Sequence, residues 1–355
     1  MLNKASIELD GVSFKVQAGI TVKRALELRG YKVSKYPDPA SLFTPCETGG
    51  CWSCAVEVDG QPQRACLTIV RDGLSIKTVL PDDYVPRRIV TGFRGHQVGG
   101  VGTPWWLKSA SGYIETACFA AGCNFRCPQC QNWDITYQSQ GKLLSPREAA
   151  ERMTEARYKF RVDRMAISGG ESTLNRAWLL EYARELNKLN SDANARIHVD
   201  TNGSILTKDY IDELVEAGVT DVGPDLKGFN LESFMRITGM EDRDLAERYQ
   251  RTAWEAVRYL IEEYKDRVFT GVGIPYNRDL ISVQEVEMMG EKLSKIDPEL
   301  QVCVLDYRPE FKKQDLVRPS YDEMVDIHKV LSGKGLKTVV CQTKYGHIGP
   351  RPDMA

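Results

Sequence analysis

Seven of the ten cysteines in this 355-residue sequence fall into two compact groups. The first group contains Cys46, Cys51, Cys54 and Cys66, and the second contains Cys123, Cys127 and Cys130. The N-terminal stretch lacks the apolar core of a secretory signal, so we expect a cytoplasmic, reducing location. Clustered cysteines in such a compartment more often bind metal or do redox chemistry than form disulfides. The two groups therefore predict two separate inorganic sites.

The first group has the spacing C-x4-C-x2-C, followed after eleven residues by its fourth cysteine. Plant-type ferredoxins use C-x4-C-x2-C and a distant fourth cysteine to hold a [2Fe–2S] cluster, and Gly49 and Gly50 allow the loop to fold closely around the sulfurs. Four thiolates can also bind zinc tetrahedrally. The x4 spacing and an upstream hairpin and helix, which resemble the β-grasp fold of ferredoxins, favour the [2Fe–2S] cluster.

The second group has only three cysteines, in the stretch AGCNFRCPQCQNWD with spacing C-x3-C-x2-C. A tetrahedral structural zinc site needs four ligands and a disulfide needs two. Three cysteines suit a [4Fe–4S] cluster in which one iron keeps an open position, where a substrate or cofactor can bind and accept an electron. This group therefore predicts a catalytic [4Fe–4S] site.

The elements that position this second group begin near residue 112. Amphipathic helical stretches separate six strand-like runs, which are GYIETACFA, RMAISG, ARIHVDTN, TDVGPDLKG, RVFTGVGIP and QVCVLDYRP. Ser145-Pro146 and Thr207 are typical helix starts, and Gly218 is a typical stop. Repeated βα units require a parallel sheet, so we expect an α/β fold containing a partial (βα)6 barrel, with its active site after the strands.

The cysteine loop after the first barrel strand resembles the signature of the radical S-adenosylmethionine (SAM) superfamily, in which the open iron chelates the amino and carboxylate groups of SAM. ISGGEST, after the second strand, matches the GGE motif of that family through Gly169, Gly170 and Glu171, which implies contacts with the methionine amino group. DTNGS and DLKGF resemble segments of glycyl-radical-enzyme activases such as the pyruvate formate-lyase activating enzyme. CNFRCPQCQNWDIT is similar to the AmmeMemoRadiSam-system branch of those enzymes. This resemblance covers residues 112–310 and implies a radical SAM enzyme.

The same resemblance implies roles for individual residues. Besides the GGE residues, Thr201, Asn202, Gln129 and Trp133 are candidates for binding SAM. The family usually has an aromatic residue before the third cysteine, against the adenine. This chain has Gln129 there, so either Gln129 hydrogen-bonds the adenine or Trp133 covers it, with core packing the alternative for Trp133.

Candidate catalytic residues lie at the later strand ends. They are Asp200, Lys227, Asp306, Tyr307 and Arg308. A buried ion pair is the alternative for Asp200 and Lys227. We expect Cys118 and Cys303 to be buried, inert thiols and His198 to be a core histidine, whereas Cys341 fits either the core or a mobile cap.

The domain organisation follows from these patterns. We expect a [2Fe–2S] ferredoxin-like domain over residues 1–82, a glycine-rich linker over 83–111, the partial barrel over 112–310 and a C-terminal helix and tail over 311–355. The linker contains five glycines between Gly92 and Gly102, which is too many for a helix or a central strand.

Composition excludes two classes of partner. The formal net charge is −2, with Lys/Arg and Asp/Glu interspersed, so we expect no nucleic-acid partner. No run approaches the roughly 20 apolar residues of a membrane span, so we expect no membrane association.

Together these features predict a radical SAM enzyme that cleaves SAM to a 5′-deoxyadenosyl radical for hydrogen abstraction from a protein or peptide. The [2Fe–2S] domain would relay electrons from an electron donor protein. Two alternatives stay open. One is a sulfur-inserting radical SAM enzyme that uses the [2Fe–2S] cluster as donor, and the other is a non-catalytic iron–sulfur electron carrier.

Overall fold

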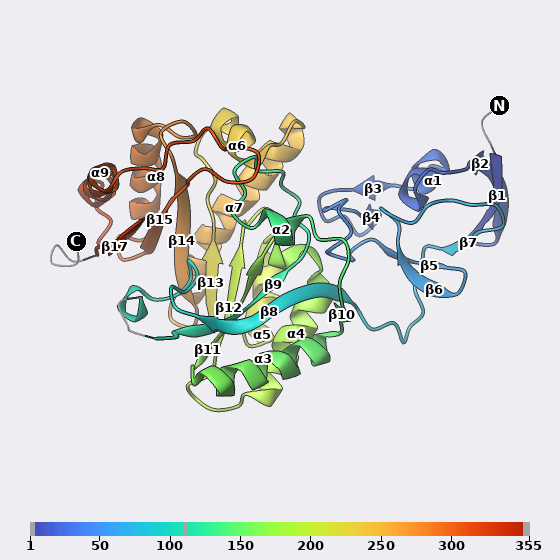
Figure 1. Cartoon of the computed structure of the whole chain (residues 1–355), viewed down its shortest axis with the longest axis horizontal. Helices are drawn as coiled ribbons and strands as arrows, with labels where there is room; N and C mark the ends of the chain where they lie inside the picture. Colours follow the sequence, from blue (N-terminus) through green and yellow to red (C-terminus); the bar gives the residue numbers. More distant parts are fainter. Residues whose placement is uncertain (1–3, 109–111, 351–355) are drawn as a thin grey trace.

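The computed structural model describes residues 4–108 and 112–350. A small N-terminal domain lies beside a larger domain built around one long sheet (Figure 1). No helix in these two ranges is both long and apolar enough to cross a lipid bilayer.

The small domain begins with a tight hairpin of β1 (Lys4–Leu9) and β2 (Val12–Gln17). Asp10 and Gly11 both have positive φ, at 48° and 80°, which is the conformation that a two-residue hairpin turn requires. Thr21 then caps helix α1 (Val22–Leu28) by accepting a hydrogen bond from the backbone of Arg24. The predicted hairpin and helix are therefore confirmed.

The sheet of this domain has the strand order β2-β1-β7-β5-β6. Its other members are β5 (Ala55–Val58), β6 (Gln61–Arg64) and β7 (Ser75–Lys77), and β3 (Val33–Ser34) pairs separately with β4 (Leu42–Phe43). Strands β1 and β7 are parallel, and the buried face of α1 packs into the same apolar core. This small α+β unit is consistent with the predicted ferredoxin-like fold.

The large domain contains a ten-stranded sheet in the order β10-β8-β9-β11-β12-β13-β14-β15-β16-β17. Its strands are β8 (Arg88–His96), β9 (Glu115–Ala120), β10 (Leu143–Leu144), β11 (Arg164–Gly169), β12 (Arg196–Thr201), β13 (Asp221–Pro224), β14 (Phe269–Tyr276), β15 (Gln301–Asp306), β16 (Thr338–Thr343) and β17 (Gly346–Ile348). Neighbouring strands from β9 through β16 are parallel, so their C-terminal ends share one edge. A partial βα barrel is thus confirmed.

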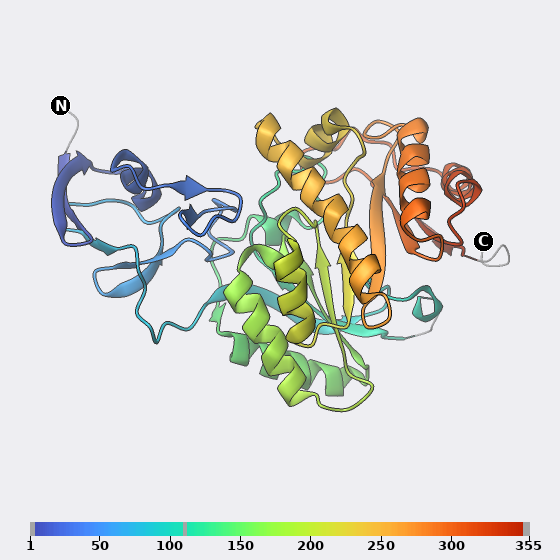
Figure 2. The same ribbon diagram turned by 180° about the vertical axis from the view of Figure 1, so that it is seen from behind.

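Helices cover the outer face of this sheet (Figures 1 and 2). They are α3 (Pro146–Phe160), α4 (Arg176–Leu189), α5 (Lys208–Glu216), α6 (Leu231–Thr238), α7 (Arg243–Tyr264), α8 (Val283–Ile296) and α9 (Tyr321–Gly333), with short turns at α2 (Trp133–Thr136), η1 (Trp105–Leu107) and η2 (Ser172–Leu174). Helix α3 starts with a capping box between Ser145 and Glu148, and α5 starts after Thr207. Both predicted helix starts are confirmed.

Two stretches of the large domain differ from the predictions. Part of the expected glycine-rich linker is strand β8, which lies between β10 and β9 rather than outside the sheet. A register shift between Gly92 and Arg94 accommodates the glycines. The expected C-terminal tail supplies β16, which adds a seventh parallel strand, and β17. The expected boundary near residue 111 lies outside the described residues.

The two domains share an apolar cluster at their junction. Tyr36, Cys46 and Cys51 of the small domain pack in it with Phe125 and Tyr249 of the large domain. The hydroxyl of Tyr36 also makes a buried hydrogen bond, 2.9 Å long, with that of Thr252. The ferredoxin-like domain is therefore packed against the barrel.

Candidate active site

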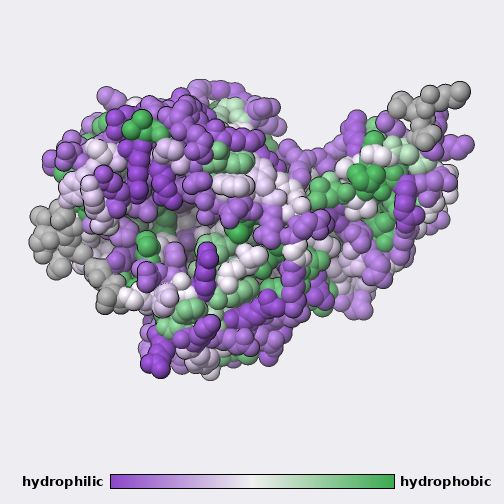
Figure 3. All heavy atoms as spheres, viewed as in Figure 1, coloured by the Kyte–Doolittle hydropathy of each residue, from purple (hydrophilic) through white to green (hydrophobic). Residues whose placement is uncertain are grey.

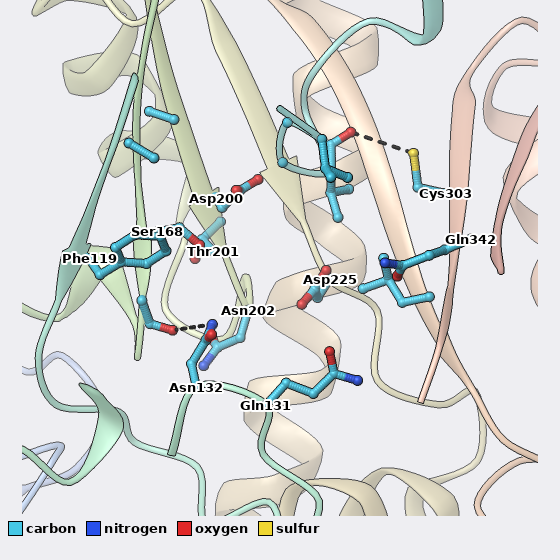
Figure 4. Close-up of a pocket in the computed structure, with 18 of the residues that line it drawn as sticks. Phe119, Gln131, Asn132, Ser168, Asp200, Thr201, Asn202, Asp225, Cys303 and Gln342 are labelled. Atoms are coloured by element: carbon cyan, nitrogen blue, oxygen red, sulfur yellow. Dashed lines mark hydrogen bonds between the residues drawn. The ribbon is translucent and has the colours of Figure 1, made fainter. Parts of the chain in front are cut away.

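A cavity of about 310 Å³ lies inside the barrel, at the C-terminal ends of its parallel strands. Figure 3 shows a hollow on this face of the large domain, and Figure 4 shows side chains from several strands pointing into the cavity. This is where the catalytic machinery of a βα barrel usually lies.

The second cysteine group forms one wall of the cavity. Cys123, Cys127 and Cys130 all line it, on the loop that follows β9. Burial raises the pKa of Cys127 to about 12 and also raises that of Cys123. Such thiols become thiolates only when a positive centre compensates the lost hydration. Three thiols, one buried and two partly buried, thus line the same cavity and could serve as sulfur ligands of a metal cluster that faces a ligand.

The predicted GGE loop closes against this cysteine loop. The backbone nitrogen of Gly170 donates to the carbonyl of Ala120, and that of Glu171 donates to the carbonyl of Gly122, each at 2.9 Å. A Cβ atom at Gly169 would lie 2.5 Å from the backbone nitrogen of Ala120, so only glycine allows this approach. Gly169 and Gly170 consequently line the cavity next to the cysteines.

Glu171 is fully buried and does not line the cavity. One of its carboxylate oxygens accepts hydrogen bonds from the hydroxyls of Thr173 and Thr201, and the other accepts one from the backbone nitrogen of Asn202. Thr201 and Asn202 do line the cavity, as predicted for residues that bind SAM. Glu171 therefore holds the segment after β12 in position.

A lysine after β13 also lines the cavity. The Nζ atom of Lys227 lies 3.0 Å from a carboxylate oxygen of Asp225 and 3.3 Å from the hydroxyl of Tyr307. Burial alone would lower the pKa of Lys227, but the charge of Asp225 raises it well above its ordinary value. The structure thus brings the predicted residues Lys227 and Tyr307 together, with Lys227 positively charged.

Asp200 points into the cavity from the end of β12 (Figure 4). Its carboxylate lies 3.0 Å from Nε2 of His198, whose Nδ1 lies 3.4 Å from Glu115. Burial would lower the pKa of His198, but the charges of Asp200 and Glu115 raise it to about 9. His198 is fully buried, as predicted for a core histidine, and pairs with Asp200.

Besides Glu171, four of the predicted catalytic and SAM-binding residues do not line the cavity. Gln129 is fully buried, and its side-chain nitrogen donates to the carbonyl of Ile237. Trp133 stacks on Phe311 with ring centroids 5.4 Å apart. Asp306 is buried in an ion pair with Arg318, and Arg308 follows β15 outside the cavity lining. No side chain of this set therefore reaches the space beside the cysteines.

Other residues line the cavity without having been predicted. They are Gln131, Asn132, Ser168 and Asp225, among others. The side-chain nitrogen of Asn132 donates to the carbonyl of Gly169 at 3.1 Å (Figure 4). Gln131 and Asn132 directly follow the last cysteine of the loop, and Ser168 and Asp225 lie at strand ends. Their places in the sequence, beside a cysteine ligand or at the active edge of the sheet, could therefore have predicted that they line the cavity.

The first cysteine group lies next to this site, at the domain junction. Cys46, Cys51, Cys54 and Cys66 are all buried. The Sγ atoms of Cys46 and Cys51 are 3.0 Å apart, and the hydrogen bond from Cys51 lowers the pKa of Cys46 to about 5. Four buried sulfurs, three on the loop before β5 and the fourth after β6, fit the ligand set of a [2Fe–2S] cluster.

Comparison with known protein families identifies the domains that contain the two cysteine groups. Residues 118–282 match the model of the radical SAM superfamily, and residues 3–81 match that of a 2Fe-2S iron-sulfur cluster binding domain. The chain contains a radical SAM domain and a [2Fe–2S] domain. The first implies a [4Fe–4S] cluster and SAM. Cys123, Cys127 and Cys130 are the sulfur ligands available to that cluster. The second implies a [2Fe–2S] cluster, which Cys46, Cys51, Cys54 and Cys66 could hold.

Similar proteins cover different parts of these two domains. A putative glycyl-radical enzyme activating enzyme of Methanocaldococcus jannaschii is 24% identical over 63% of this chain and 79% of its own length. A probable GTP 3′,8-cyclase of Thermoplasma volcanium is 32% identical over 34% of this chain. One of the subunits of the NADH-quinone oxidoreductase of Mycobacterium bovis is 35% identical over 23% of this chain. The alignments span 35% of the cyclase and 10% of the oxidoreductase polypeptide.

Solved structures similar to this chain include Streptococcus suis SuiB bound to S-adenosylmethionine. The TM-score is 0.47 at 12% identity, and the match covers 62% of this chain and 48% of SuiB.

Proposed function

We propose that this chain is a radical SAM enzyme that cleaves SAM reductively and abstracts a hydrogen atom from a protein or peptide substrate. The [4Fe–4S] cluster, when bound, supplies an electron to SAM, which yields methionine and a 5′-deoxyadenosyl radical. The observation that carries the proposal is the cavity itself, where the three cysteines lie beside Gly169, Gly170 and Asn202. The side chains of this chain have to bind SAM, exclude water and orient the substrate.

Lys227 and its neighbours in the cavity supply charge for binding. Lys227 is cationic and hydrogen-bonds Asp225 and Tyr307, so the three side chains form a fixed polar surface. We assign this surface to substrate or to the SAM carboxylate, together with Asp200. The protein or peptide substrate is proposed because a relative that aligns over 79% of its own length is a putative glycyl-radical enzyme activating enzyme. An external electron donor protein would reduce the [2Fe–2S] domain.

Formation of 5′-deoxyadenosine tests the proposal. Anaerobically reconstituted protein, incubated with SAM and dithionite, should release 5′-deoxyadenosine and methionine, measured by chromatography. The Cys127→Ala variant is the control and should release neither. A reconstituted wild-type protein that binds no SAM and releases no 5′-deoxyadenosine would instead support a non-catalytic electron carrier.

A further inference from the structure

The loops that carry the two cysteine groups are in direct contact. Gly122, immediately before Cys123, lies against the other loop so closely that a Cβ atom there would be 2.8 Å from the backbone nitrogen of Cys51. It would also be 3.2 Å from the Cβ atoms of both Cys46 and Cys51. No side chain fits between a ligand of the first site and the residue that precedes a ligand of the second.

The same contact is equally close when viewed from the first loop. A Cβ atom at Gly50 would lie 2.7 Å from the carbonyl carbon of Ala121 and from the backbone nitrogen of Gly122. Cys46 and Cys51 are at most 1% exposed, so water does not separate the loops here. Cys54 and Cys66 belong instead to the apolar core of the small domain. The half of the first site that contains Cys46 and Cys51 is therefore the half that touches the barrel.

Hydrogen bonds fix the two loops to each other. The carbonyl of Ile89 accepts a hydrogen bond from Ala121, while its backbone nitrogen donates to the carbonyl of Gly50. The guanidinium of Arg126 donates to the carbonyl of Cys123 at 2.7 Å and also to the carbonyl of Cys46. Because one strand and one arginine bond both loops, the spacing between the sites does not depend on a flexible linker.

We propose that a single electron passes directly from the [2Fe–2S] cluster to the [4Fe–4S] cluster across the contact between Cys51 and Gly122. The step oxidises the reduced [2Fe–2S] cluster by one electron and reduces the [4Fe–4S] cluster by one. An external one-electron protein reductant then reduces the first cluster again. This inference rests on the proposed function, because it assigns the electron route of the same site. It requires no movement of the small domain, since electron tunnelling is fast across packed atoms at contact distance.

The magnetic interaction between the clusters tests the contact without any measurement of catalysis. In wild-type protein with both clusters reduced, the electron paramagnetic resonance spectrum should differ from the sum of the single-cluster spectra, with splitting or broadening and faster spin relaxation. Cys51→Ala and Cys123→Ala, each checked for its remaining cluster by iron content, supply those single spectra. An additive spectrum would overturn the inference.

A bulky side chain introduced between the two loops tests the electron route. Gly50 does not have a positive φ, so Gly50→Leu is compatible with its backbone but forces the loops apart. In Gly50→Leu protein whose iron content shows that both clusters are present, the rate at which a protein reductant reduces the [4Fe–4S] cluster should fall about tenfold or more, equivalent to about 1.4 kcal/mol of barrier. Cleavage of SAM driven by dithionite, which reduces that cluster directly, should stay at the wild-type rate. Gly333→Leu, where the new Cβ meets nothing within 4 Å, is the matched control and should change neither rate.

The outcomes separate this inference from the proposed function. If wild-type protein cleaves no SAM with dithionite but its reduced clusters interact magnetically, the proposed function fails and the contact stands. If it cleaves SAM but the reduced clusters give additive spectra, or Gly50→Leu retains the wild-type rate with the protein reductant, the direct route fails and the function stands.

Discussion

The carboxylate of Glu171 accepts a hydrogen bond from the backbone nitrogen of Asn202 at 2.6 Å, and it faces this segment instead of the cavity. The family resemblance implies that the same carboxylate contacts the methionine amino group of SAM. The structure gives it the task of holding Thr201 and Asn202, which line the cavity. Glu171 is therefore a positioning residue, and its loss should weaken SAM binding by displacing Thr201 and Asn202.

We expect Glu171→Ala to weaken SAM binding about tenfold to hundredfold while both clusters remain, because Thr201 and Asn202 lose the charged acceptor that holds them at the cavity, and hydrogen bonds to a charged group contribute about 1.5–3 kcal/mol. Titration of SAM against the spectrum of the reduced [4Fe–4S] cluster measures the affinity. A double-mutant cycle with Asn202→Ala identifies the route, since two residues that act as one unit give non-additive losses. Additive losses would show that Glu171 acts independently of Asn202.

The ligand assignment of the [4Fe–4S] site predicts a sharp difference between cysteines. Cys123→Ala, Cys127→Ala and Cys130→Ala should each lose the cluster signal and all SAM cleavage. Cys118→Ala should retain both, because Cys118 lies within β9, fully buried and 3.6 Å from the hydroxyl of Tyr182. Iron content and spectra of the reduced proteins are the measurements. Loss of the cluster in Cys118→Ala, with retention in Cys130→Ala, would make the assignment wrong.

The relay role and the sulfur-donor role of the [2Fe–2S] domain predict different behaviour for Cys51→Ala. If the domain relays electrons, this variant should cleave SAM at the wild-type rate with dithionite and more slowly than wild type with a protein reductant. A donor role stops product formation with either reductant, and it consumes the [2Fe–2S] absorbance of the wild-type protein in proportion to turnover. Parallel assays with the two reductants, with absorbance recorded during turnover, distinguish the roles. Equal activity of variant and wild type with the protein reductant would contradict both.

The buried pair of His198 and Asp200 predicts a pH dependence of stability. The pKa of His198 is raised to about 9 in the folded protein, against about 6.5 in an unfolded chain. The protonated form is therefore favoured by folding, so its contribution is complete below pH 6.5 and is lost as the pH rises through 9. The difference amounts to about 3 kcal/mol in the free energy of unfolding.

Denaturant unfolding between pH 6 and pH 10 should show this loss in the wild-type protein and a smaller loss in His198→Gln. The comparison with the variant removes the contribution of other titrating groups, including the tyrosines and lysines. Wild-type and variant curves that stay parallel across this range would contradict the assignment of a charged His198.

The buried guanidinium of Arg88 should contribute strongly to the free energy of unfolding. Arg88 is fully buried and donates to the carbonyl oxygens of Ala121, Glu171 and Ser172, so it ties the cysteine loop to the GGE loop. Arg88→Met should reduce the free energy of unfolding by at least about 2 kcal/mol, because these buried acceptors lose a charged donor.

The neighbouring residue Arg87 provides the matched control for this substitution. It pairs with Glu148 on the surface, so Arg87→Met should cost at most about 1 kcal/mol. Thermal unfolding of the two variants measures the difference. Equal losses in both would contradict the proposed role of Arg88.

The βα pattern and the motifs at strand ends could be predicted from the sequence because both depend on local order along the chain. Four residues lie at the end of a parallel strand or directly after it, so the shared edge of the sheet brings them to one cavity: Gly169, Gly170, Thr201 and Asn202. Side-chain direction was harder to predict. Successive residues of a strand face opposite sides, so Leu305 and Tyr307 line the cavity while Asp306 pairs with Arg318 on the other side.

Tertiary context explains why strand β8 was not predicted from the sequence. Strand β8 contains Gly92 and Gly95, which local propensity assigns to a linker, yet close packing requires both. A Cβ atom at Gly92 would lie 2.8 Å from the ring of Phe119, and one at Gly95 would lie 2.5 Å from the ring of Tyr113. The glycines thus permit a strand beside aromatic rings, and no local pattern reveals those rings.

The burial of Cys46 and Cys51 at the domain junction has a consequence for how the protein acquires its iron. These sulfurs are covered by Cys123 and Phe125 of the other domain in one shared apolar cluster. We therefore expect iron to reach these sulfurs fastest while the two domains are apart. Reconstitution of the folded, iron-free protein should accordingly load the first cysteine group more slowly than reconstitution of a chain whose domains have not yet packed together.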